Sequence, residues 1–157
     1  MLPITHQNEI HLQACDVDIA NRWKPSAILI AAQEAAELHA DALGCGHRQM
    51  VARGNFFILM RVRAQMHDYP KLGDGVHITT WPGEVRRTIF PRYYRFRDAA
   101  GNEIGHMSSV WMICDIESRK ILTPEQGSVT MPEKPEPTVF PAPEKIVFPE
   151  GAGETVS

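Results

Sequence analysis

The sequence predicts an α+β fold in which a curved antiparallel sheet surrounds one buried helix. Three features support this prediction: a long apolar helical segment in the first third of the chain, strand-like segments separated by turns after it, and a proline-rich end that suits neither. The chain has 157 residues, of which 43% are hydrophobic and 22% charged, so its size and composition suit one globular domain.

The predicted helix begins at Pro25 and Ser26, because proline suits the first helical turn and serine caps free backbone N–H groups. It runs to about Leu43, where Gly44 and Gly46 supply the left-handed conformation that commonly closes a helix. Apolar residues cover most of its circumference, so we expect it to be buried, and its alanines allow a curved sheet to approach closely. A narrow polar stripe remains, at about 100° per residue: Ser26, Gln33, Glu34, Glu37 and Asp41.

One strand is predicted before the helix and four after it. The predicted strands are residues 9–15, 55–67, 76–81, 86–97 and 104–115, with a possible continuation at residues 120–121. The breaks contain Tyr69-Pro70, Gly73-Asp74-Gly75 and residues 98–101, at spacings that suit an antiparallel meander. Everything between Gly46 and the proline-rich end is therefore expected to be strand or turn.

The last part of the chain changes in character. Half of the 12 prolines lie in residues 131–157, which excludes a central strand or a long helix there. We therefore predict a single domain over residues 1–130 and an extended tail or linker over residues 131–157.

Charge and motifs exclude several classes of protein. The net charge of −3 predicts no nucleic-acid-binding surface, and no apolar run is long enough for a membrane span or a secretory signal, so a cytoplasmic location is expected. The three cysteines form no CxxC pair and are expected to be reduced. The histidines lack the i, i+4 spacing of a helical zinc pair, so neither a metal nor a cofactor is predicted.

Several motifs resemble the first half of acyl-ACP thioesterases, over about residues 10–124, and the order of elements resembles the hotdog fold. The matching motifs, in order, are Gln33-Glu34, His39, Gly44, Tyr69-Pro-Lys-Leu-Gly-Asp74, Thr80-Trp81, Arg92-x-Tyr94-x-Phe96-x-x-Asp98-x-x-Gly101, Ser109-x-Trp111, Asp115-x-Glu117-x-Arg119 and Pro124. The resemblance implies a hotdog, in which the sheet wraps around one central helix. It also implies a role in hydrolysing acyl thioesters.

One departure limits what the resemblance implies about catalysis. Members of this family usually carry two hotdogs, and the catalytic Asp-x-Asn-x-His motif belongs to the second. The equivalent turn here reads Asp18-x-Ala20-x-Arg22, so it keeps only the aspartate. The proline-rich tail resembles the family's interdomain linker, and the chain is read either as a freestanding hotdog or as the front half of a longer protein.

The candidate catalytic residues are Glu34, Asp18 and Asn21. Thioester hydrolysis needs a base beside the acyl carbonyl and donors for the oxyanion. We expect Glu34 to be the general base or nucleophile, because hotdog enzymes often place an acidic residue there. Asp18 would orient the attacking water or Glu34, Asn21 would donate to the carbonyl, and N–H groups at the helix start would polarise it. The alternative for Glu34 is a solvated helix residue, and for Asp18, Asn21 and Asp16 it is turn chemistry.

The candidate substrate-binding residues are Arg86, Arg87, Arg92, Arg61 and Phe57. The arginines suit the phosphates of coenzyme A or phosphopantetheine, with an exposed strand face as the alternative, while Phe57 suits either the core or an acyl tunnel. His39, set among alanines and leucines, is expected to be a core residue. Cys45 beside His47 is interpreted as a coincidence of a glycine-rich turn.

The function predicted is hydrolysis of an acyl thioester carried by acyl carrier protein or coenzyme A, with water as the only cosubstrate. Two alternatives stay open: a noncatalytic acyl-binding module, and a hotdog dehydratase or hydratase in which His39 or His47 meets a carboxylate. A homodimer is also predicted, because residues 55–63 form an apolar strand without proline that is suited to pair with its own copy.

Overall fold

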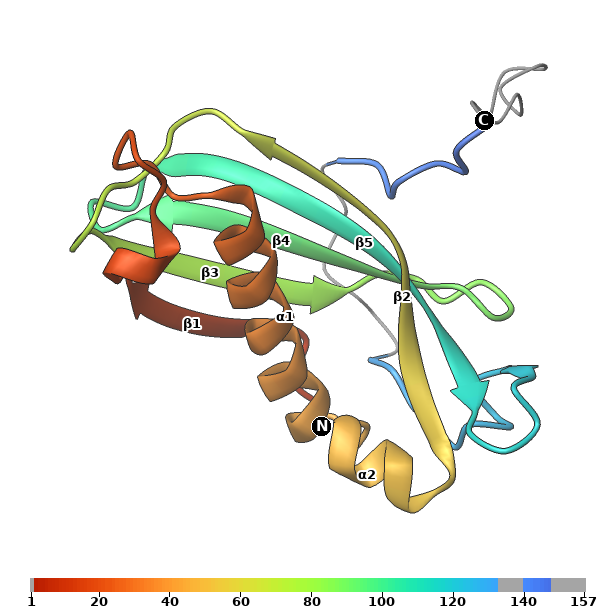
Figure 1. Ribbon diagram of the computed structural model, residues 1–157. Helices are drawn as coiled ribbons and strands as arrows, with labels where there is room; N and C mark the ends of the chain where they lie inside the picture. Colours follow the sequence, from red (N-terminus) through yellow and green to blue (C-terminus); the bar gives the residue numbers. More distant parts are fainter. Residues whose placement is uncertain (1, 133–139, 148–157) are drawn as a thin grey trace.

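A computed structural model describes residues 2–132 and 140–147, and it shows a hotdog: one long helix, α1, lies across one face of a curved antiparallel sheet (Figure 1). The elements are β1 His6–His11, a 3₁₀ turn at Ala14–Asp16, α1 Pro25–Ala42, α2 His47–Ala52, β2 Asn55–Met66, β3 Gly75–Pro82, β4 Phe90–Asp98, β5 Glu103–Asp115 and β6 Ile121–Leu122. Over the described ranges, no helix is long and apolar enough to cross a membrane.

The strand order is β1-β3-β4-β5-β2, with β6 paired to the end of β5. The predicted four-strand meander is therefore wrong for β2, which pairs with β5 and forms an edge of the sheet. Residues 67–74 cross between distant strands instead of closing a hairpin. The loop before α1 holds this crossing in place: the Trp23 N–H donates to the carbonyl of Pro70 at 2.8 Å, and the Leu72 N–H donates to Asn21 Oδ1 at 2.9 Å.

Two predicted strand boundaries are wrong because local turns compete with the sheet. The first strand ends at His11 rather than residue 15, since the Gln13 N–H binds Asp16 Oδ2 at 2.8 Å and closes the 3₁₀ turn. β4 begins at Phe90 rather than residue 86, because Arg86 and Ile89 exchange both backbone hydrogen bonds at 3.0 Å around a tight hairpin turn.

A short helix, α2, occupies residues that we expected to be turn or strand. Its first free N–H groups have side-chain partners: Gly46 donates to Gln49 Oε1 at 2.7 Å, and His47 donates to Glu37 Oε1 at 2.6 Å. Gly46 and Gln49 form a local cap at i, i+3 spacing, and Glu37 adds a second partner from α1, ten residues earlier in the chain. Part of the signal for this helix is therefore local.

The main core lies between α1 and the sheet. Small side chains of α1, among them Ala32 and Ala35, are buried against large residues of β3 and β4. Trp23 closes one end by packing edge-on against Phe96, with ring centroids 5.5 Å apart. The prediction that alanines let the sheet approach the helix is thus confirmed.

The outer face of the sheet, opposite α1, carries a separate aromatic cluster. Trp81 and Tyr93 pack there with Phe140, and Ser108 Oγ donates to the carbonyl of Pro141 at 2.8 Å. Phe140 and Pro141 therefore hold the start of this tail segment against the outer face, whereas residues 144–147 are exposed. Residues 140–147 contain neither helix nor strand, while residues 133–139 and 148–157 of the predicted tail lie outside the described residues.

We expect Gly105→Ala to lower the free energy of unfolding by about 1–3 kcal/mol, the usual cost of overpacking. A Cβ at Gly105 would lie 2.7 Å from the Gln65 carbonyl oxygen and 3.1 Å from Met66 Cα, and backbone atoms of a paired strand cannot move aside cheaply. Gly75→Ala is the matched control, because its nearest atoms would lie at an ordinary 3.6 Å. Urea unfolding measures both, and equal losses would contradict the prediction.

Candidate functional site

An open groove of about 550 Å³ runs between α1 and the strands β2 and β5. It exists because α1 packs mainly on β1 and β3, so that its other flank, toward β2, is left largely open. The groove is lined by Ile30, Gln33, Glu34, Glu37, His47, Met50, Phe57 and Trp111. The polar stripe of α1 therefore supplies two carboxylates and an amide to an otherwise largely apolar groove.

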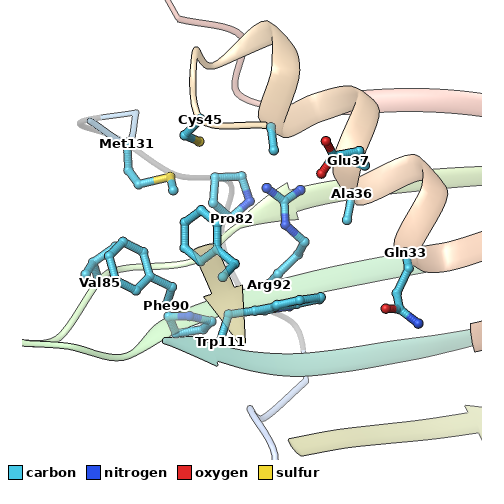
Figure 2. Close-up of a pocket in the computed structure, with 13 residues that line it drawn as sticks. Gln33, Ala36, Glu37, Cys45, Pro82, Val85, Phe90, Arg92, Trp111 and Met131 are labelled. Atoms are coloured by element: carbon cyan, nitrogen blue, oxygen red, sulfur yellow. The ribbon is translucent and has the colours of Figure 1, made fainter. Parts of the chain in front are cut away.

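A smaller cavity of about 70 Å³ adjoins the groove and shares Gln33, Glu37, Phe57 and Trp111 with it. Pro82, Val85 and Phe90 form much of its wall, and Arg92 lies against it. Figure 2 shows the Arg92 side chain reaching from the sheet toward α1, on the side where Glu37 and Cys45 lie. The cavity thus combines apolar walls with one buried cation.

The guanidinium of Arg92 is held by uncharged partners. The residue is only 7% exposed, and its Nη1 donates to His39 Nδ1 and to Thr80 Oγ1, each at 3.2 Å. Within the described residues no carboxylate lies within ion-pair distance of it. Burial lowers the pKa of Arg92.

His39 is a buried core histidine, as predicted. Its Nε2 lies 3.1 Å from the Pro3 carbonyl oxygen, so this nitrogen carries the proton and Nδ1 accepts from Arg92. Burial, reinforced by the Arg92 cation, lowers the His39 pKa to about 4. With both ring nitrogens occupied inside the core, His39 meets no carboxylate, which leaves His47 as the histidine available to a dehydratase.

We expect acidification from pH 7 to pH 5 to remove about 2 kcal/mol of stability through His39. The folded-state pKa lies below the ordinary value of 6.5, so the contribution is complete above 6.5 and is lost as the pH falls toward 4. Urea unfolding at both pH values measures the loss.

His39→Gln keeps a hydrogen-bond donor and an acceptor but does not titrate. Its loss of stability between pH 7 and pH 5 should therefore be about 2 kcal/mol smaller than that of wild type. His47→Gln, at an exposed histidine, is the control that should retain the full loss. An unchanged pH dependence in His39→Gln would contradict the prediction.

The predicted catalytic residues do not come together. Glu34 is exposed and lines the groove, about 14 Å along α1 from the helix start at the usual rise per residue. Asp18 lies before that start, where its carboxylate accepts from the Ala20 and Arg22 N–H groups at 2.9 and 3.0 Å. The Arg22 hydrogen bond above all lowers the Asp18 pKa. The helix-start N–H groups are likewise remote from Glu34.

Asn21 is also used by the fold. It has a left-handed backbone with φ 54°, and its side-chain oxygen accepts from Leu72. Asp18 and Asn21 thus fasten the turn before α1 and the 67–74 crossing, which matches the turn chemistry kept open for both. Asp16, similarly, closes the 3₁₀ turn through Gln13.

The predicted substrate-binding residues separate into three places. Phe57 lines both the groove and the small cavity, and packs edge-on against Phe90 with centroids 5.4 Å apart. Arg92 lies inside the fold, so it is not part of an exposed strand face. Arg86 and Arg87 lie in the hairpin after β3, where Arg86 is exposed and pairs with Glu84 at 3.4 Å, whereas Arg61 lies on edge strand β2.

Sequence reasoning did not select Gln33, Glu37 and Trp111 as site residues, although all three line both cavities. Gln33 and Glu37 are four residues apart, so they lie on one face of α1, beside Glu34 on the polar stripe. This spacing could have identified both as site residues. Cys45 is buried, and burial raises its pKa to about 11, so it remains a neutral thiol. This supports interpreting its position beside His47 as coincidence.

The family model of the acyl-ACP thioesterase N-terminal domain matches residues 3–127 of this chain. The chain belongs to the acyl-ACP thioesterase family. A search of curated protein sequences returned no match.

Solved structures share the fold at low sequence identity. An acyl-ACP thioesterase from Bacteroides thetaiotaomicron superposes with a TM-score of 0.80 at 20% identity, over 92% of this chain and 59% of its own. The 12:0-ACP thioesterase from Umbellularia californica gives 0.73 at 17% identity, over 94% and 58%. A DHNA-CoA thioesterase from Staphylococcus aureus gives 0.73 at 14%, over 78% and 83%. The chain therefore spans about three-fifths of the length of the Bacteroides thetaiotaomicron and Umbellularia californica enzymes.

Proposed function

We propose that this hotdog binds an acyl thioester in the groove beside α1 and hydrolyses it. The observation that carries the proposal is the meeting of an apolar groove with the carboxylate of Glu34. Membership of the thioesterase family supports it. The acyl chain would lie along Phe57 and Trp111 and extend toward the small cavity.

In this proposal, Glu34 takes the proton of the attacking water while a bond forms between the water oxygen and the acyl carbon. The C–S bond then breaks, and the leaving thiolate takes up the proton held by Glu34. Gln33, adjacent to Glu34, provides a side-chain amide that can donate to the carbonyl oxygen as it becomes negative. Asp18 and Asn21 hold the loops before α1 and do not touch the reacting atoms.

The carrier would approach along the hairpin after β3. Val85 lines the small cavity, and Arg86 and Arg87 follow it directly on the surface. Their guanidinium groups suit the phosphates of coenzyme A or of the phosphopantetheine arm of acyl carrier protein. Arg61 lies on β2, where it would contact a carrier only from the edge of the sheet.

A second copy of the chain would complete the site. β2 is an edge strand, and Met60 and Val62 on it are 47% and 38% exposed. A further cavity of about 280 Å³ separates this strand from the start of α1, so the open flank runs along the helix. Pairing of β2 with its own copy would cover the apolar strand and enclose the groove. Light scattering should then report twice the 17.6 kDa chain mass.

A noncatalytic acyl-binding module is the second candidate, favoured by one observation. The one aspartate retained from the family's catalytic motif, Asp18, has its carboxylate engaged by Ala20 and Arg22. A module of this kind would use the same groove for binding and leave the chemistry to another domain.

A thiol-release assay with short-, medium- and long-chain acyl-CoA and acyl-ACP tests the proposal. Tryptophan fluorescence measures binding in parallel, because Trp111 lines the groove. Turnover supports the hydrolase, whereas binding without turnover supports the acyl-binding module. Neither binding nor turnover at any chain length would overturn both.

A further inference from the structure

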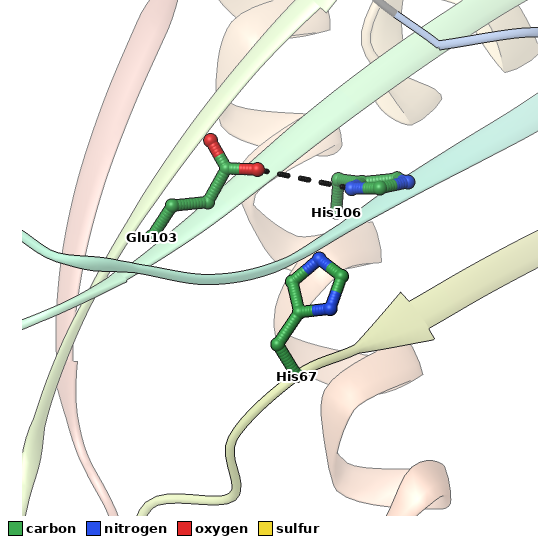
Figure 3. A group of neighbouring side chains, drawn as sticks. All are labelled: His67, Glu103 and His106. Atoms are coloured by element: carbon green, nitrogen blue, oxygen red, sulfur yellow. Dashed lines mark ion pairs between the residues drawn. The ribbon is translucent and has the colours of Figure 1, made fainter.

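We propose that His67, Glu103 and His106 form a binding site for a divalent transition metal of the zinc type on the outer face of the sheet. One ring nitrogen of each histidine and one carboxylate oxygen of Glu103 lie within 4.8 Å of one another (Figure 3). Among the described residues, no other three histidine, cysteine or acidic side chains converge this closely. The site is remote from the groove, which lies on the α1 side.

A β-bulge brings Glu103 and His106 to the same face. Residues three apart on a regular strand point to opposite faces. Here the pairing of β4 with β5 shifts, so that Arg95 lies opposite His106 while Arg97 lies opposite Glu103. Since Arg95 and Arg97 share a face, their partners share it too, and the irregularity at Ile104 re-aims Glu103.

The pairing of β2 with β5 brings in His67. Gln65 lies opposite His106, and His67 follows two residues later, which places it diagonally beside His106 on the same face. The His67 N–H donates to the Ile104 carbonyl at 2.8 Å, so its backbone is held against the bulge. The two imidazole rings lie 5.8 Å apart at their centroids.

Neighbouring side chains hold two of the three ligands in place. The Arg95 Nε lies 3.0 Å from Glu103 Oε2, which balances part of the carboxylate charge and leaves Oε1 toward His106 Nδ1, at 3.8 Å. The ring of Phe140 stacks on His106 with centroids 4.3 Å apart and planes 20° from parallel. Supporting contacts of this kind orient the ligands of metal sites in proteins.

The set of donors selects the class of ion. Two imidazoles and one carboxylate are ligands typical of zinc and its neighbours, whereas calcium and magnesium prefer all-oxygen sites. Tetrahedral zinc separates its ligand atoms by about 3.4 Å. The 3.8 Å distance between Glu103 Oε1 and His106 Nδ1 is near this value. Rotation of the exposed His67 side chain would bring its ring nitrogen to a similar distance from both atoms. Water would fill the fourth position.

A bound metal would clamp the start of the 67–74 crossing to β5. It would also fix the His106 ring, against which Phe140 is packed. Because the metal binds the folded arrangement, it should raise the thermal unfolding temperature in proportion to its affinity.

Isothermal titration calorimetry of the full chain with Zn²⁺, after removal of metal with EDTA, tests the proposal. Wild type should bind one Zn²⁺ per chain. His67→Ala, His106→Ala and Glu103→Gln should each weaken binding at least about tenfold, since even supporting partners contribute that much. His77→Ala is the matched control, because His77 also lies on the outer face beside a carboxylate, Glu9, at 4.0 Å. It should bind as wild type does.

Co²⁺ absorption gives a second, independent readout, since d–d bands report tetrahedral coordination. Circular dichroism verifies that each variant is folded. Absence of Zn²⁺ binding, or equal binding by wild type and all three ligand variants, would overturn the site. Neither readout depends on thioester hydrolysis, so its result is separate from the proposed function.

Discussion

Replacing Glu34 with glutamine is expected to lower kcat for acyl thioester hydrolysis by about 10²- to 10⁴-fold, the usual contribution of a general base. Glutamine has the shape of glutamate but cannot accept the proton of the attacking water. Glu34 lines the groove and is exposed, so the substitution disturbs no packed neighbour. Initial rates of thiol release from the best acyl-CoA substrate measure the effect.

Glu117→Gln is the matched control, because Glu117 lies exposed in the turn after β5, outside both cavities. It should hydrolyse the substrate at the wild-type rate. KM should change little in Glu34→Gln, since the apolar lining of the groove is intact. Equal kcat in wild type and Glu34→Gln would remove Glu34 from the mechanism and require another general base.

The helix and its buried face could be predicted because the information is local. Pro25 begins α1 and Gly44 follows its end, and the apolar circumference follows directly from the spacing of residues between them. The pairing of β2 with β5 could not be predicted in the same way. It joins segments about 50 residues apart, and alternation within a strand does not say which strand is its neighbour.

The direction of the Glu34 side chain could be predicted from helical spacing, and Glu34 lines the groove. Phe57 also lines the groove, but it lies on strand β2. The expected link between Asp18 and Glu34 fails because a long stretch of α1 separates the two residues. The His67, Glu103 and His106 cluster was missed for a related reason: the spacing rule for metal ligands on helices does not apply across a bulged β-ladder.

The position of Arg92 could have been read from strand alternation. Arg92, Tyr94 and Phe96 share one face of β4, while Tyr93 and Arg95 share the other. Because Tyr94 and Phe96 are the residues best suited to the core, alternation buries Arg92 with them. From the sequence alone, Arg92 was grouped with the exposed Arg86 and Arg87, so the buried arginine was not separated from those on the surface.

Phe96→Ala is expected to lower the free energy of unfolding by about 3–5 kcal/mol, the range for removing a fully buried phenylalanine. Its ring fills the space between α1 and β4 and supports Trp23 edge-on, and the small alanines of the helix cannot move into the void. Urea unfolding monitored by circular dichroism measures the change. Ile30→Ala, at a helix position that is 66% exposed, should change stability by no more than about 0.5 kcal/mol. If the two variants lost equal stability, the interface between α1 and the sheet would not be the main core of this hotdog.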